Sequence, residues 1–140
     1  MNTTLSARDT ASRGFAGWLH NTIGTRSDLL LRLIVGGMLI PHGIGKFMNM
    51  AKEVEVFGQV FKLHPAEAWV PAMALFQVIA GALLVFNRVT RLSALAVVLF
   101  MVGTIVVANG GNGWFWHLKG IEYAVMWALL ALIVAARAER

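Results

Sequence analysis

Six side chains that can donate, accept or carry a proton lie in or beside the long apolar stretches of this 140-residue chain. They are His42, Lys46, Gln77, His117, Glu122 and Tyr123. Imidazole, ammonium, amide, carboxyl and phenol groups recognise polar ligands and take part in proton transfer. An ionisable side chain inside a membrane helix costs about 2.5–3.5 kcal/mol at mid-depth on insertion scales, so each needs a reason. We therefore treat these residues as a candidate ligand pocket, without assigning a catalytic role to any of them.

Some of the polar residues in the apolar stretches also have a structural explanation, and the sequence leaves both interpretations open. Gln77 can hydrogen-bond to a neighbouring helix, which is the interpretation that we favour for it. Glu122 can pair with Lys119 three positions earlier on the same helix face. Arg32, near the start of an apolar run, can extend its head group to the membrane surface.

The chain lacks the residues and motifs that several common kinds of catalysis require. The chain has no cysteine, which excludes disulfides and thiolate chemistry, and it has no Walker A, GxGxxG, HExxH or GxSxG motif. His42 is the one histidine well inside an apolar run, so a bis-histidine haem is disfavoured. We predict no metal site and no intrinsic cofactor.

The elements that must position the candidate residues are four apolar runs of 19–21 residues. At 1.5 Å per residue each run spans about 30 Å as a helix, which is the thickness of the hydrocarbon layer. The chain is 58% hydrophobic and 14% charged, with a mean hydropathy of +0.69, so too few polar side chains remain for a water-facing surface. We predict an all-α fold, an integral membrane four-helix bundle. The expected spans are about 29–47, 66–86, 89–108 and 118–136.

The polar segments predict the orientation of this bundle. Arginines are concentrated in the tails and the second loop, which places both termini in the cytoplasm by the positive-inside rule. The basic residues are too scattered for a nucleic-acid site. The expected organisation is a cytoplasmic N-terminal tail (1–27), a transmembrane domain (28–136) and a cytoplasmic C-terminus (137–140). Within the tail, residues 14–23 are expected to form an amphipathic interfacial helix, with a disordered tail as the alternative.

The opposite rim of the bundle is expected to gather the polar groups. His42 and Lys46 end the first run, while His117 and Glu122 flank the start of the fourth, so they converge at the outer leaflet above Gln77. The first loop (48–65) carries an apolar stripe that suggests a short helix, with a plain loop as the alternative. An aromatic belt is expected at the same level. It comprises Trp69, Trp114 and Trp116.

Three segments resemble the DoxX/DoxD-like family of small four-helix bacterial membrane proteins. They are LRLIVGGMLIPHGIGKF (31–47), PAMALFQVIAGALLVFNRVTRLSAL (71–95) and GWFWHLKGIEYAVMWALLAL (113–132). The family commonly has a glutamate in the second helix, where this chain has Gln77. The resemblance implies a multi-pass protein of the bacterial inner membrane. Some members of the family are membrane subunits of quinone-linked oxidoreductases, such as thiosulfate:quinone oxidoreductase, and the resemblance implies such a role here.

From this resemblance we expect a membrane subunit of a redox complex that docks a partner and contributes the outer pocket. His42 or Lys46 would hydrogen-bond a quinone carbonyl, and Tyr123 and Trp116 would flank the ring. Electrons would come from a redox protein partner, so any enzymatic activity would belong to the complex. A non-catalytic scaffold or accessory subunit is the alternative, and a small-molecule or ion carrier a lesser one. The expected partners are the lipid bilayer and either a redox protein or further copies of the chain.

Overall fold

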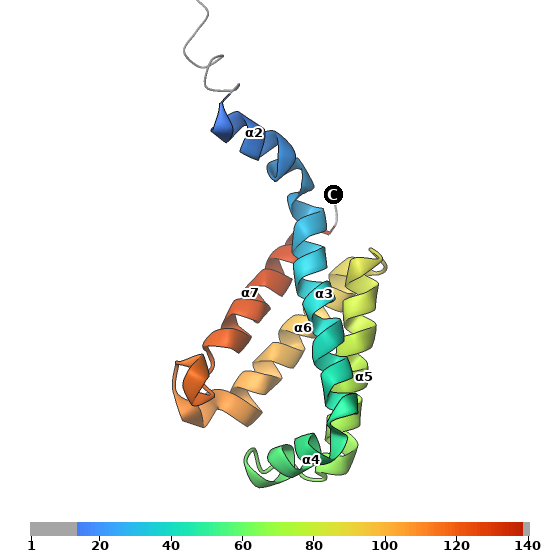
Figure 1. Ribbon diagram of the computed structural model, residues 1–140, viewed down its shortest axis with the longest axis vertical. Helices are drawn as coiled ribbons and strands as arrows, with labels where there is room; N and C mark the ends of the chain where they lie inside the picture. The colour runs from blue at the N-terminus through green and yellow to red at the C-terminus, as the bar shows by residue number, and fades with distance from the viewer. Residues whose placement is uncertain (1–13, 139–140) are drawn as a thin grey trace, which may run out of the picture.

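The computed structural model describes residues 14–138, and these residues contain helices and turns but no strand (Figure 1). The prediction of an all-α fold is confirmed for this part of the chain. Residues 1–13 of the predicted tail and residues 139–140 lie outside the described residues. The long helices are α3 (Ser27–Met48), α5 (Ala66–Val85), α6 (Thr90–Thr104) and α7 (Glu122–Arg137). The short elements are α2 (Phe15–Thr22), η1 (Gly24–Arg26), α4 (Met50–Gln59), η2 (Ile105–Asn109), η3 (Gly110–Asn112) and η4 (Trp116–Leu118).

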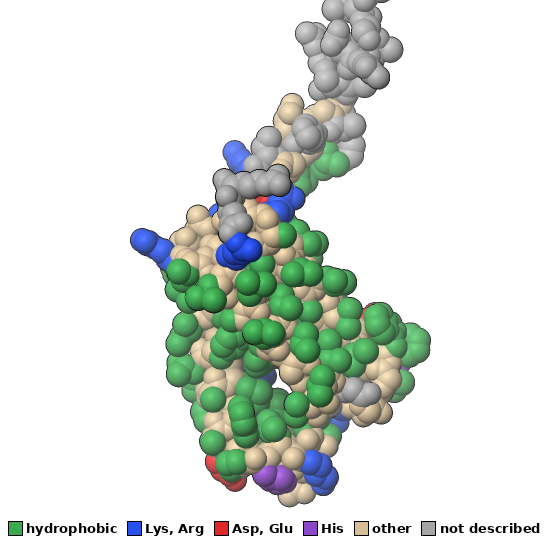
Figure 2. Space-filling model, turned by 180° about the vertical axis from the view of Figure 1, so that it is seen from behind, with side chains coloured by type: hydrophobic (Ala, Val, Ile, Leu, Met, Phe, Trp, Pro, Cys, Tyr) green, Lys and Arg blue, Asp and Glu red, His purple; other side chains and the backbone are tan. Residues whose placement is uncertain are grey.

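The long helices make this a membrane protein. Three of them are long and apolar enough to cross a bilayer, namely α3, α5 and the segment Thr90–Val107, which includes the start of the π-helical turn η2. Large apolar side chains such as Leu99 and Val106 are more than 70% exposed. Apolar side chains cover most of the face drawn in Figure 2. Lipid is the solvent that suits such a surface. Helix α7 is shorter, with 16 residues or about 24 Å, so its crossing and the cytoplasmic location of both termini stay predictions.

Helices α3 and α5 pack backbone to backbone through small residues. A Cβ placed on Gly36 would lie 2.6 Å from the carbonyl oxygen of Gly81, and one placed on Gly43 would lie 2.6 Å from that of Ala74. Only glycine allows such an approach, and small residues are typical of helix contacts in membranes. Gly36 and Gly43 share their face of α3 with Lys46, which is also buried. This face of the first span points into the bundle.

Helices α6 and α7 form a second pair, which joins the first at the end of the bundle where the described chain begins and ends. Arg137 near the end of α7 forms an ion pair with Asp28 at the start of α3 and donates a hydrogen bond of 2.9 Å to the Ser27 hydroxyl. Between α5 and α6 the chain turns within a few residues, with Asn87 and Val89 at positive φ. The two pairs are therefore held together at this end.

At the opposite end longer connections join the two helices of each pair, α3 to α5 and α6 to α7 (Figure 1). The short helix expected in the first loop is confirmed as α4. Helix α7 begins at Glu122, four residues after the start of the predicted fourth span. The reason lies in the preceding turn, where the Ile121 and Glu122 N–H groups donate to the carbonyl oxygens of Gly113 and Trp114. These bonds hold residues 113–121 in a compact loop that cannot continue the helix.

Candidate functional site

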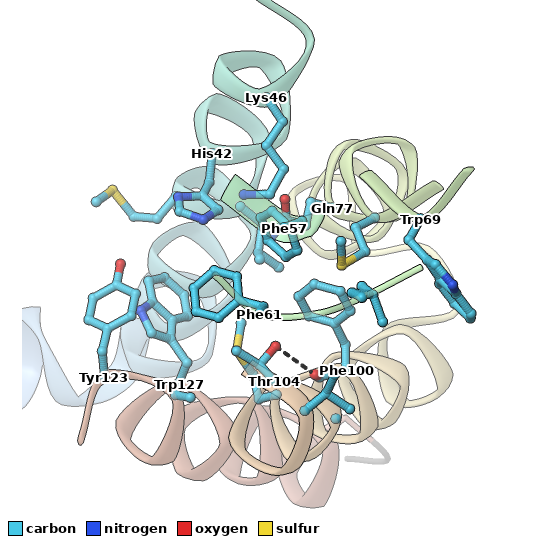
Figure 3. A pocket seen from close by; sticks show the side chains of 18 residues that line it. His42, Lys46, Phe57, Phe61, Trp69, Gln77, Phe100, Thr104, Tyr123 and Trp127 are labelled. Carbon is cyan, nitrogen blue, oxygen red and sulfur yellow. Dashed lines mark hydrogen bonds between the residues drawn. The ribbon is translucent and has the colours of Figure 1, made fainter. Parts of the chain in front are cut away.

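A cavity of about 420 Å³ lies between the two helix pairs, at the end away from the ion pair of Arg137. The last turns of α3, the α4 segment, the first half of α5, the end of α6 with η2 and the start of α7 all line it (Figure 3). Its walls are mostly apolar and rich in aromatic rings and methionines. The volume is within the range of about 300–1,000 Å³ that small-molecule sites usually have.

Lys46 brings a positive charge to this apolar space. The residue is 8% exposed, and among the described residues no carboxylate forms an ion pair with it. Its Nζ lies 5.9 Å from the centroid of the Phe57 ring, which is within reach of a cation–π interaction. His42, one turn earlier on α3, also lines the cavity. The carboxylate of Glu53 on α4 attracts this ammonium electrostatically but makes no ion pair with it. A buried ammonium without an ion-pair contact is costly, so this corner of the cavity suits a ligand that accepts hydrogen bonds or carries negative charge.

Gln77 lies on the α5 side of the same cavity and is 3% exposed. The sequence favours an interhelical hydrogen bond for this side chain, and the structure does not support that interpretation. Its Oε1 atom has no hydrogen-bond partner in the described part of the chain. The physical reason is that the facing stretch of α3 is Gly43, which has no side chain to offer and comes close to the Gln77 Cβ.

Trp127 on α7 is a functional candidate that the sequence analysis missed. The residue is 5% exposed, it lines the cavity, and its Nε1–H has no acceptor within residues 14–138. The neighbouring Tyr123 ring packs edge-on against it, with 5.9 Å between the centroids. One signal was available in the sequence, because membrane tryptophans are usually found at the interface, whereas Trp127 lies more than a turn inside a span.

Four of the six candidate residues line the cavity, and two do not. Lys46 and Gln77 face Tyr123 from across the cavity (Figure 3), with His42 beside Lys46. His117 lies in the short helix η4 before α7, and Glu122 is the first residue of α7. Neither residue lines the cavity. The compact turn before α7 holds them there. The His117 ring lies 5.7 Å from that of Phe115.

The predicted belt tryptophans are found at the same end of the molecule. Trp69 and Trp114 are about half exposed, and Trp69 also borders the cavity. The side chain of Trp116, which was expected to flank a ligand ring, is outside the described residues. The belt stays a prediction.

The arrangement can bind a flat apolar molecule with polar substituents. Aromatic side chains, among them Phe57, Phe61 and Phe100, supply surfaces for a ring, while Lys46, Gln77 and Trp127 supply the polar contacts. Thr104 also lines the cavity, but its hydroxyl already donates to the Phe100 carbonyl at 3.0 Å. Within residues 14–138 no cluster of three or more His, Asp or Glu side chains is suited to a metal.

Fold and site together define a small helical membrane protein with an apolar cavity between two helix pairs. The DoxX family model matches residues 27–110, which include α3 to α6 and the cavity walls that they form. The chain belongs to the DoxX family.

One relative in Bacillus subtilis (strain 168) is the protein named "Putative oxidoreductase CatD". It is 34% identical to this chain over 87 residues, which are 62% of this chain and 60% of the relative. The chain thus matches less than two thirds of that protein. No solved structure matches this chain.

Proposed function

We propose that this DoxX protein is a multi-pass inner-membrane subunit of a redox complex and that its cavity binds a quinone. The observation that carries the proposal is the buried ammonium of Lys46, which faces an apolar and aromatic cavity and has no ion-pair partner among residues 14–138. A quinone ring fits both properties, since its faces are apolar and its carbonyl oxygens accept hydrogen bonds.

The residues around Lys46 support a ring in a defined orientation. Phe57 holds the ammonium by its ring face, which restricts where the Nζ protons can point. His42 lies on the same side of the cavity. Its imidazole can donate a second hydrogen bond to the same carbonyl oxygen, or it can supply the proton that this oxygen takes up on reduction. Tyr123 and Trp127 on the opposite wall cover the other side of the ring.

Electron transfer to such a quinone needs a partner. The chain has no cysteine for an iron–sulfur cluster, and its candidate residues bind and orient rather than carry electrons. A flavin, haem or metal protein docked on this subunit would supply the electrons. The word "oxidoreductase" in the name of the Bacillus subtilis relative is consistent with a quinone-binding subunit that works with an electron-donating partner.

Quinone binding by purified protein tests the proposal. The protein is extracted from native membranes in mild detergent, and its bound quinone is quantified by chromatography of the solvent extract. Lys46→Met should lose most of the quinone, because a charged donor to the carbonyl oxygen is removed while the chain length is kept. Lys52→Met is the matched control, since Lys52 is exposed on α4 and does not line the cavity. Protein that carries no quinone and binds none when it is supplied contradicts the proposal.

A further inference from the structure

We propose that the cavity holds its ligand from both walls, with the Trp127 N–H as the contact on α7 opposite Lys46 and Gln77. The site would then select a ring with oxygen substituents on opposite edges, such as a 1,4-quinone and its quinol. This inference rests on the proposed function and narrows its ligand class. It also makes Trp127 a specificity-determining residue.

The unpartnered indole is the first step of the argument. A buried tryptophan N–H nearly always finds an acceptor, and an orphaned one needs an explanation. Trp127 is 5% exposed, lines the cavity and has no acceptor in the described chain, although its neighbour Tyr123 contacts its ring. The partner that we assign to it is an oxygen atom of a bound ligand. Because Nε1 itself is covered and lies on the Tyr123 side of the indole, the ring must rotate slightly to reach such an oxygen (Figure 3).

The second step is an orphaned acceptor on the other helix pair. Gln77 Oε1 is buried on α5 without a donor among the described residues, close to the α3 wall that carries Lys46. Figure 3 shows Lys46 and Gln77 on one side of the cavity and Trp127 on the other. A ligand with one polar end would satisfy one of these walls and leave the other unpaired.

The two walls also fit both redox forms of such a ring. Trp127 can only donate, and a ketone or hydroxyl oxygen can accept from it. Gln77 can present its oxygen to a hydroxyl proton, and rotation of the amide presents its NH₂ group to a ketone oxygen. Lys46 donates to either oxygen. The site can therefore keep its contacts when a 1,4-quinone becomes the quinol.

Two probes separate a two-walled site from a one-walled site. Decyl-1,4-benzoquinone carries two opposed carbonyls, and a decyl-substituted aryl ketone carries one. Their affinities for the detergent-solubilised protein are measured by isothermal titration calorimetry. Wild-type protein should bind the quinone about three- to tenfold more tightly than the ketone, as expected for one additional neutral hydrogen bond.

Trp127→Phe removes the N–H and keeps an aromatic ring. This variant should lose about three- to tenfold in quinone affinity, while its ketone affinity changes by less than twofold. The ligand-free variant should melt within a few degrees of wild type, because the deleted N–H bonds to nothing in the described chain. Trp114→Phe, at a half-exposed position outside the cavity lining, is the control and should bind both probes as wild type does.

The outcomes distinguish this inference from the proposed function. Equal quinone affinity in wild type and Trp127→Phe overturns the two-walled site but leaves quinone binding intact. Equal affinity of wild type for quinone and ketone overturns it without the need for any variant. Failure of wild type to bind either probe overturns both proposals.

Discussion

The contact between Gly36 on α3 and Gly81 on α5 allows a quantitative test of the fold. Gly36→Ala adds one methyl group to the tightest part of the interface. That carbon would lie 2.6 Å from the Gly81 carbonyl oxygen and 2.8 Å from the Leu84 Cβ. Neither obstacle can rotate away, because one is backbone and the other is fixed to backbone. The helices must move apart instead.

The size of the effect follows from these distances. The added carbon falls about 0.8 Å short of the 3.4 Å at which ordinary contact begins, so α3 and α5 must separate by a similar amount. Inserting a methyl group into a close-packed core typically costs about 1–3 kcal/mol. Alanine also gains helix propensity over glycine, by about 0.8–1.0 kcal/mol, and that gain must be subtracted with a control.

Gly37 provides this control one residue along the same helix. A Cβ at Gly37 meets nothing within 4 Å, so Gly37→Ala receives the propensity gain without the clash. Unfolding of both variants is followed by circular dichroism in the same detergent, as a function of temperature and of added dodecyl sulfate. Gly36→Ala should be less stable than Gly37→Ala by about 1–3 kcal/mol. Equal stability, or a more stable Gly36→Ala, would refute backbone contact between α3 and α5.

Two further predictions concern the cavity and the end of the bundle that joins the helix pairs. Gly103→Leu should lower quinone affinity at least tenfold in the same calorimetric assay without lowering the melting temperature, because Gly103 lines the cavity and an added Cβ meets nothing within 4 Å. Val102→Leu, at an outward position, is its control, and retained quinone binding in Gly103→Leu would place the ligand elsewhere. Asp28→Asn breaks the ion pair with Arg137, and since both side chains are about half exposed, the free energy of unfolding should fall by less than about 1 kcal/mol. A double-mutant cycle with Arg137→Gln measures this coupling, and a value above 3 kcal/mol would show that the pair is shielded from solvent.

The helices and the inward face of α3 could be predicted from the sequence because both follow from local rules. Long apolar runs can only be helices in lipid, since each backbone group must find its partner within the segment. Gly36 and Gly43 are seven residues apart, so they lie two turns apart on one face of the helix. The structure places both against α5. Lys46 follows on this face, which brings its ammonium inside the bundle.

The remaining features depend on contacts that the sequence pattern does not contain. The sequence favours a hydrogen bond for Gln77, but a bond needs a partner at the right height on the facing helix, and that position is a glycine. The start of α7 depends on bonds from Ile121 and Glu122 back to residues 113 and 114, which a search for apolar runs cannot detect. The depth of Trp127 in its span is unusual for a tryptophan, but the sequence does not show that its N–H lacks an acceptor.

The location of the cavity follows from how the two helix pairs are joined. Small residues set the distance between α3 and α5, and buried apolar side chains pack α6 against α7. Neither pair can open without losing these close contacts. The pairs are tied together at one end by the short turn after α5 and by the Arg137 ion pair. At the other end the connections run within each pair, from α3 to α5 and from α6 to α7. Space can therefore open between the pairs at that second end, where α4 and its phenylalanines lie across it. A polar residue becomes part of the site when its helix carries it to this end and turns it toward the gap between the pairs, which is why Lys46, Gln77 and Trp127 meet there while Arg32 does not.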